Sequence, residues 1–187
     1  MAIHLSHRSA AYRFFRDICI VVDLIERCSL SIPDIYLEAL VSAEDRRFWF
    51  HPGVDFFAII RAAYRGVFFK RREGASTIEA QLFRVVTGRR ELSFPRKARE
   101  IFAALVISLV CEKRSIAFAY LDNAFFGYER RGIRYAAEKY ACSLDEGKID
   151  EVALLISLIR RPMSANYHGP RRDLLVKRIK WLSARIS

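Results

Sequence analysis

The stretch Glu44-Asp45-Arg46-Arg47-Phe48-Trp49-Phe50-His51-Pro52-Gly53 combines two adjacent carboxylates, a histidine and a Pro-Gly pair. The apolar residues before it recur at helical spacing, which predicts that Glu44 lies near the end of an amphipathic helix that Pro52-Gly53 breaks. A carboxylate at such a break can face a cleft, where a general base is useful. The alternative is a salt-bridged helix end, with His51 as a capping or packing residue.

The next polar cluster, Gly74 to Gln81, opens a predicted helix. Ser76 and Glu79 have the spacing of a capping box, which satisfies free amides at a helix start. The functional alternative is that Gly74 lets backbone amides approach an anion at the positive helix end. Both interpretations can hold together. Further donors on the same face would be Thr77, Gln81 and Arg84.

A third cluster begins another helix, with Ser93 as the expected cap and Pro95 at a first-turn position. The first turn then carries Arg96, Lys97 and Arg99, at the end where the helix dipole disfavours cations. A solvated charged face is the ordinary explanation. A bound anion at that end would offset the unfavourable charge, and this functional interpretation is preferred.

The composition around these clusters favours one mainly α-helical domain. The chain has 187 residues, of which 52% are hydrophobic and 13% aromatic, so it can bury a sizeable core. Only eight glycines and five prolines argue against an all-β fold with many turns. We expect helices near residues 9–27, 33–46, 54–69, 77–87, 94–112, 114–124, 130–141, 149–160 and 171–185.

The net charge of +11 indicates a polyanionic partner, which could be nucleic acid, an anionic membrane surface or a phosphorylated substrate. The cysteines show no C-x-x-C spacing and are predicted to be buried free thiols. Because the histidines are dispersed as well, no metal site is predicted from spacing. The cysteines are Cys19, Cys28, Cys111 and Cys142.

We expect residues 1–30 to form an N-terminal helical extension with no transmembrane span. The longest uncharged apolar run, Ile101 to Cys111, falls short of the ~20 residues that a spanning helix needs. Charged residues interrupt the N-terminal segment, so it does not have the pattern of a signal peptide. It is either a surface-lying amphipathic helix or a core helix. Its apolar face would carry Phe14, Ile18, Val21, Val22 and Ile25.

Taken in order, these clusters resemble the motifs of glycosyltransferase family 51, the peptidoglycan glycosyltransferase domain. The family pattern ED-x-x-F-x-x-H-x-G matches residues 44–53, G-x-S-T-I-x-Q-Q resembles 74–81, and R-K-x-x-E matches 96–100. A fourth and a fifth motif resemble residues 120–127 and 153–162. The resemblance covers residues 31–185 in the right order and spacing.

The resemblance implies a mainly α, lysozyme-like domain over residues 31–187, with a large lobe and a small jaw lobe flanking a cleft. It implies polymerisation of lipid II into glycan strands with inversion and release of undecaprenyl pyrophosphate. Glu44 matches the general base, and Glu100 matches a second glutamate near the pyrophosphate. The residues implied in substrate binding are Asp45, Phe48, His51, Ser76, Thr77, Gln81, Arg84, Arg96 and Lys97.

The family resemblance also implies the surroundings of the reaction. No cofactor is expected to be required. A divalent cation, Mg or Mn, could bind at the pyrophosphate. The expected partners are lipid II, the growing glycan strand, the anionic membrane surface and other cell-wall synthesis proteins. The expected location is the outer, periplasmic face of the bacterial cytoplasmic membrane, as a peripheral protein.

Departures from the family pattern leave an alternative open. The first glutamine of the Gln-Gln pair is Ala80, the usual lysine is Arg84, and the usual asparagine after it is Val85. The arginine before the third motif is replaced by Leu92. A degenerate, non-catalytic lipid II-binding or regulatory domain is therefore the second hypothesis. A basic nucleic-acid binder would explain the charge but not the two glutamates at matched positions.

Overall fold

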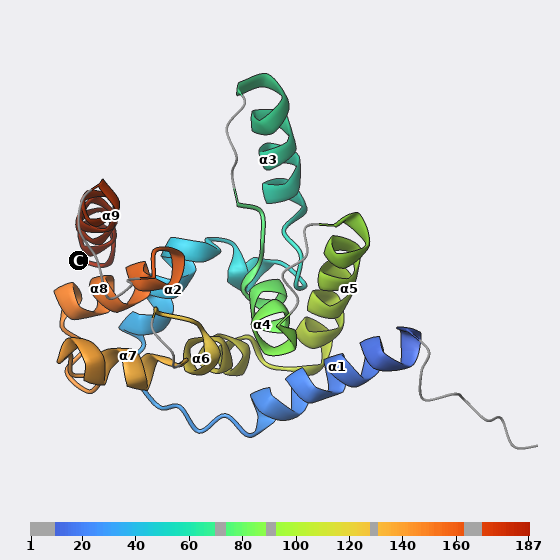
Figure 1. Cartoon of the computed structure of the whole chain (residues 1–187), viewed down its shortest axis with the longest axis horizontal. Coiled ribbons are helices and arrows are strands. Elements are labelled where there is room, and N and C mark those ends of the chain that lie inside the picture. Colours follow the sequence, from blue (N-terminus) through green and yellow to red (C-terminus); the bar gives the residue numbers. More distant parts are fainter. Residues whose placement is uncertain (1–9, 70–73, 89–92, 128–130, 163–169) are drawn as a thin grey trace, which may run out of the picture.

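The computed structural model describes residues 10–69, 74–88, 93–127, 131–162 and 170–187 (Figure 1). The described residues are mainly α-helical and contain no strand, apart from an isolated bridge between Phe125 and Arg131. Each predicted helix is present, with its ends within three residues of those expected. The elements are α1 (Ala10–Glu26), α2 (Ile35–Glu44), η1 (Phe48–Phe50), α3 (Phe56–Phe69), α4 (Ile78–Thr87), α5 (Phe94–Val110), α6 (Lys113–Asn123), α7 (Ile133–Tyr140), α8 (Ile149–Arg160) and α9 (Pro170–Ile186).

The core joins two groups of helices. In one group α4 packs against α5 and α6, with α1 across them, and in the other α2 packs against α8 and α9. Apolar residues at helical spacing supply the buried faces, such as Leu40 in α2, Leu82 in α4 and Ile156 in α8. α2 also contacts α6, so the two groups share one hydrophobic core.

α1 is a core helix. It buries Ile18, Val21 and Ile25 and packs against α4, α5 and α6. Phe14 lies edge-on to Phe83, with ring centroids 6.0 Å apart. The prediction of a core helix is confirmed for this face, and the alternative of a surface-lying face is wrong. The reason is that α4, α5 and α6 together offer an apolar surface that the face covers.

α3 projects away from the rest of the molecule (Figure 1). The Asp55 carboxylate accepts a hydrogen bond from the amide of Ala58 at 3.0 Å, which caps the start of this helix. Large exposed apolar side chains of this kind mark a surface that contacts something else. On α3 they are Phe56, Phe57, Ile60, Tyr64 and Phe68.

No helix among the described residues combines the length and the apolar content that crossing a membrane requires. The four cysteines are free, as predicted, but they are not buried. Cys19 is exposed and the other three are half-buried. The prediction of buried thiols is wrong, most clearly at Cys19, which follows the buried Ile18 and therefore points to the outer face of α1.

Candidate active site

Glu44 is the last residue of α2, as the sequence predicted. The helix ends there because Asp45 leaves the helical region (φ −153°, ψ 80°), so it stops earlier than the Pro52-Gly53 break expected from the sequence. The Glu44 side chain is only 4% exposed. Arg178 of α9 donates a hydrogen bond from Nη2 to Oε1 at 2.7 Å, and Nη1 of Arg160 lies 3.9 Å from Oε2.

The environment of Glu44 acts on its pKa in two directions. Burial raises the pKa, and the charges of Arg178 and Arg160 and a hydrogen bond from Gln81 oppose that rise. Burial also lowers the pKa of Arg178, although Glu44 opposes this. A carboxylate whose pKa is raised toward neutrality can accept a proton from an alcohol more readily than an ordinary one.

Gln81 connects Glu44 to the start of α4 and to α6. Its amide nitrogen donates to the carbonyl of Ser76 at 3.3 Å, and its Oε1 accepts from the Tyr120 hydroxyl at 2.8 Å. Burial raises the pKa of Tyr120, so this hydroxyl keeps its proton and remains a donor. The Oγ of Ser76 is buried without a hydrogen-bond partner. It is therefore a polar atom still available to a ligand.

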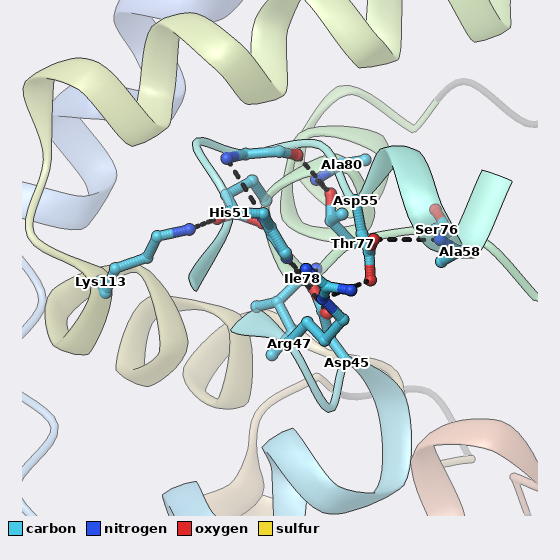
Figure 2. A network of polar contacts seen from close by, with 12 residues as sticks. Asp45, Arg47, His51, Asp55, Ala58, Ser76, Thr77, Ile78, Ala80 and Lys113 are labelled. Carbon is cyan, nitrogen blue, oxygen red and sulfur yellow. Dashed lines mark hydrogen bonds and ion pairs between the residues drawn. The ribbon is translucent and has the colours of Figure 1, made fainter. Parts of the chain in front are cut away.

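Behind Glu44, a buried polar network joins the first two sequence clusters (Figure 2). Asp45 Oδ2 lies 3.0 Å from His51 Nε2 and accepts from the Ile78 amide at 3.2 Å. The Gly53 amide donates to His51 Nδ1 at 3.2 Å, so Nδ1 carries no proton and Nε2 donates to Asp45. The Thr77 hydroxyl donates to the Gly53 carbonyl at 2.8 Å.

The residues of this network are bonded to one another within the protein. The side chains of Asp45, His51 and Thr77 are buried, and their hydrogen bonds join the loop after Glu44 to the start of α4. Phe48 is fully buried in the core beside His51. All four were predicted to bind substrate, and this stays a prediction. In the structure they fix the loop after Glu44 against the start of α4.

The predicted capping box at the start of α4 is wrong. The N-cap is Thr77, whose Oγ1 accepts from the Ala80 amide at 3.4 Å, and Ser76 lies one residue before it. Glu79 is fully buried and pairs with Lys113 at the start of α6. A cation from a distant element therefore binds the carboxylate that was expected to cap its own helix. Burial raises the pKa of Glu79, and Lys113 opposes this.

Gly53 brings the loop after Glu44 against α5. It has φ +89°, and a Cβ there would lie 2.2 Å from the carbonyl oxygen of Ala104. Only glycine fits this close approach. A small hollow beside it is lined by residues of all three sequence clusters, among them Gly53, Ala75, Thr77, Ala80 and Lys97.

The first turn of α5 follows the sequence prediction. Ser93 caps it, accepting from the Arg96 amide at 3.3 Å, and a proline lies in the first turn. Glu100 is 2% exposed and forms an ion pair with Arg96, while Lys97 Nζ lies 3.6 Å from its Oε2. This internal carboxylate offsets part of the repulsion among the first-turn cations. Burial lowers the pKa of Lys97, which Glu100 opposes and nearby Arg84 reinforces.

Arg84 links the two glutamates electrostatically. Tyr120 is close enough to both Glu44 and Arg84 for each charge to affect its pKa, and Lys97 is affected in the same way by Arg84 and Glu100. Arg84 therefore lies near both Tyr120 and Lys97. These side chains come from α2, α4, α5 and α6.

Four residues of this arrangement were not predicted as part of the site. Tyr120 and Arg160 stand within the fourth and fifth motifs, which was a usable signal. Lys113 and Arg178 had none, because their partners Glu79 and Glu44 lie 34 and 134 residues away along the chain.

The acidic residues of the site do not fit a divalent cation. Ligand atoms of Asp45, His51 and Glu79 lie within 4.8 Å of one another, a grouping that sequence spacing did not reveal. Both nitrogens of His51 are already hydrogen-bonded, and Glu79 pairs with Lys113. Glu100 likewise faces two cations. Mg²⁺ and Mn²⁺ prefer several free oxygen ligands, which neither group offers.

The helical lysozyme-like fold, with the buried Glu44 paired to Arg160 and Arg178, is that of a transglycosylase domain. The chain matches the transglycosylase family over residues 26–186 and belongs to it, that is, to glycosyltransferase family 51. It is 35% identical over 160 residues to penicillin-binding protein 1A of Rickettsia conorii, covering 80% of this chain and 20% of the relative.

Two further relatives show the same relation. The chain is 36% identical over 158 residues to penicillin-binding protein 1A of Aquifex aeolicus, covering 79% of this chain and 22% of the relative. It is 34% identical over 137 residues to penicillin-binding protein 1A of Escherichia coli, covering 72% and 16%. The chain thus spans about a fifth of the length of the curated relatives it matches.

Proposed function

We propose that this chain is a peptidoglycan glycosyltransferase that polymerises lipid II and releases undecaprenyl pyrophosphate. The observation that carries the proposal is the position of Glu44. It is a buried carboxylate with a raised pKa, at a helix end, next to polar groups that continue to the cations of α5. An acid group placed in this way can act as the base of a sugar transfer.

In the proposed reaction, Glu44 takes the proton of the 4-hydroxyl of the acceptor sugar. The electron pair freed on that oxygen forms a bond to the anomeric carbon of the donor strand, from the face opposite the leaving group. The bond between that carbon and the diphosphate oxygen breaks, and its electron pair leaves with undecaprenyl pyrophosphate. The configuration at the anomeric carbon is inverted.

The departing diphosphate gains negative charge, which fixed cations and donors can stabilise. Arg96 and Lys97 stand at the positive end of α5, and Glu100 orients both. Arg84 is close to Lys97, and the Ser76 hydroxyl is unpaired. We therefore assign leaving-group binding to Ser76, Arg84, Arg96 and Lys97, and the role of a positioning residue to Glu100. No step requires a divalent cation.

We place the reaction at the outer face of the cytoplasmic membrane, where a lipid-linked substrate would be presented. The exposed apolar side chains of α3 suit contact with the acyl region of a bilayer. The net charge of +11 suits an anionic membrane surface. Lipid II, the growing glycan strand and other cell-wall synthesis proteins are the proposed partners.

A non-catalytic lipid II-binding domain is the second candidate, and one observation favours it. Glu44 is held by two guanidinium groups, which compete with an incoming sugar alcohol. The Arg160 contact is 3.9 Å long and its side chain is half exposed, so this partner can move aside. Turnover therefore depends on how firmly Arg178 holds the carboxylate.

Glycan strand formation from labelled lipid II, with the full chain in detergent or vesicles, separates the two candidates. We expect polymer from the wild-type chain and none from Glu44→Gln at the same concentration. Both proteins should bind lipid II and show the same helical circular dichroism. A folded wild-type protein that binds lipid II and forms no polymer would establish the non-catalytic candidate.

A further inference from the structure

α8 and α9 form the sides of an open groove of about 280 Å³ beside Glu44. α8 and α9 lie on the other side of α2 and α4 from α5 (Figure 1). The groove was not predicted as part of the site. Its lining consists of Arg160, Arg161, Leu174, Lys177, Arg178 and Trp181.

The groove carries an excess of positive charge. Within the part of the chain that the structure describes, Glu44 is the carboxylate that pairs with the lining, through Arg160 and Arg178. Arg161 and Lys177 have no ion-pair partner among the described residues. Arg160 and Arg161 both lie close enough to Arg178 to lower its pKa. Such mutual repulsion is relieved when an anion binds.

The groove also has an unused donor and an ordered guanidinium group. The Nε of Arg178 is buried without a hydrogen-bond partner. The guanidinium carbon of Arg178 lies 5.9 Å from the centre of the Trp181 ring, and that of Arg185 lies 5.2 Å from it. Stacking on an aromatic ring restricts the side chain and aims its remaining donors. Arg178 can therefore serve Glu44 with Nη2 and an anion in the groove with other donors.

The proposed reaction brings together two anionic substrates. The cations of α5 are assigned to the diphosphate that leaves the donor. Glu44 pairs with Arg160 and Arg178 of the groove lining, and the acceptor hydroxyl must reach Glu44 from a side that the donor does not fill. The groove is a second cationic surface, and it is in direct contact with Glu44.

We propose that this groove binds the anionic part of the acceptor, with Arg161, Lys177 and Arg178 as its ligands; the inference rests on the proposed function. The bound group is an oxyanion, supplied either by the acceptor's diphosphate or by the carboxylates of its peptide. Because Arg178 is shared, an anion in the groove competes with Glu44 for this guanidinium group. Arrival of the acceptor thereby loosens the grip on the base.

A binding titration tests the groove without turnover. In a Trp49→Phe background, Trp181 becomes the sole tryptophan, and its fluorescence reports on the groove. Inorganic pyrophosphate and a soluble disaccharide-peptide without lipid or diphosphate are titrated separately. We expect saturable binding of one probe, which identifies the source of the anion. Arg161→Ala and Lys177→Ala should each weaken it about 3- to 10-fold.

Lys180→Ala is the matched control, because Lys180 is an exposed cation on the same helix but does not line the groove. Binding should be unchanged in this variant. The inference is overturned if neither probe binds, or if Lys180→Ala weakens binding as much as Lys177→Ala does. Lys177→Ala and Lys180→Ala remove exposed side chains and Arg161→Ala removes a partly exposed one, and thermal unfolding checks that each variant is folded.

Steady-state kinetics with lipid II separate this inference from the proposed function. If the groove serves the acceptor, Lys177→Ala raises KM about 3- to 10-fold with kcat largely retained. A wild-type chain that polymerises, with an unchanged KM in Lys177→Ala, overturns the groove and leaves the function intact. A wild-type chain that never polymerises but binds a probe in the groove overturns the function and supports the anion subsite.

Discussion

Glu44 and Glu100 are both almost fully buried and both bound to cations, yet their partners come from different distances along the chain. Arg96 and Lys97 lie within one turn of Glu100 on the same helix. Arg160 and Arg178 reach Glu44 from α8 and α9. The pairing at Glu100 is complete once α5 forms, whereas the pairing at Glu44 depends on the packing of three helices. A local pair suits a fixed anchor for cations, and a distant pair suits an acid whose surroundings a ligand can change.

The largest expected effect is on catalysis at Glu44. Glu44→Gln removes the base and keeps the shape, so kcat for glycan strand formation should fall by about 10²- to 10⁴-fold. The measurement is polymer formation from labelled lipid II under saturating substrate. Retention of activity within about 3-fold would show that Glu44 is not the base and would remove the functional difference between the two glutamates.

Gly53 packs the loop after Glu44 against Ala104 of α5, the helix that carries Glu100, and a substitution at Gly53 can break this contact. Gly53→Ala should lower the free energy of unfolding by about 2–4 kcal/mol, because the added Cβ meets the Ala104 carbonyl and the backbone is left-handed. Gly88→Ala is the matched control, with φ +67° but open space around it, and should cost about 1 kcal/mol. Denaturant unfolding measures both. Equal losses in the two variants would contradict the close packing at Gly53.

At the other glutamate, Glu100→Gln releases Arg96 and Lys97 from their shared counter-ion. We expect kcat/KM to fall about 10- to 100-fold, with a fall in kcat, because the contacts that stabilise the departing diphosphate lose their geometry. Kinetics with lipid II, beside those of Glu44→Gln, measure the contrast. A kcat/KM that stays within about 3-fold of the wild-type value would contradict the role of Glu100 as an anchor for these cations.

The smallest effect is a shift in pH dependence at Arg178. The charge of Arg178 lowers the pKa of Glu44, so Arg178→Gln should raise it. The base must be unprotonated to act, and the acid limb of kcat/KM should therefore move to higher pH. Arg178→Lys should restore part of the profile, and Lys180→Ala should leave it unchanged. An unchanged acid limb would show that the charge of Arg178 does not affect the pKa of the base.

The raised pKa of Glu44 also has a consequence for stability. The folded state holds this proton more tightly than the unfolded chain does. The stabilisation is fully present below the unfolded pKa of a glutamate, about 4.3, and is lost as the pH rises through the folded value.

Local rules were sufficient for the helices and for several site residues. Apolar periodicity predicted each helix, and Ser93 was correctly predicted as a cap. The same rules failed at Glu79, because its carboxylate pairs with Lys113, which no local pattern connects to it. They also missed the Glu44–Arg178 pair, since side chains 134 residues apart share no periodicity. The motifs identified the residues of the buried network but did not predict that they are buried.

The ion pair between the ends of α2 and α9 affects how the protein matures. Glu44 leaves the ribosome long before the helix that neutralises it. A nascent chain lacking α9 would bury a carboxylate whose guanidinium partner has yet to be synthesised, and the acid would stay protonated or that corner would stay open. The surroundings of Glu44 described above are therefore complete only when α9 has docked.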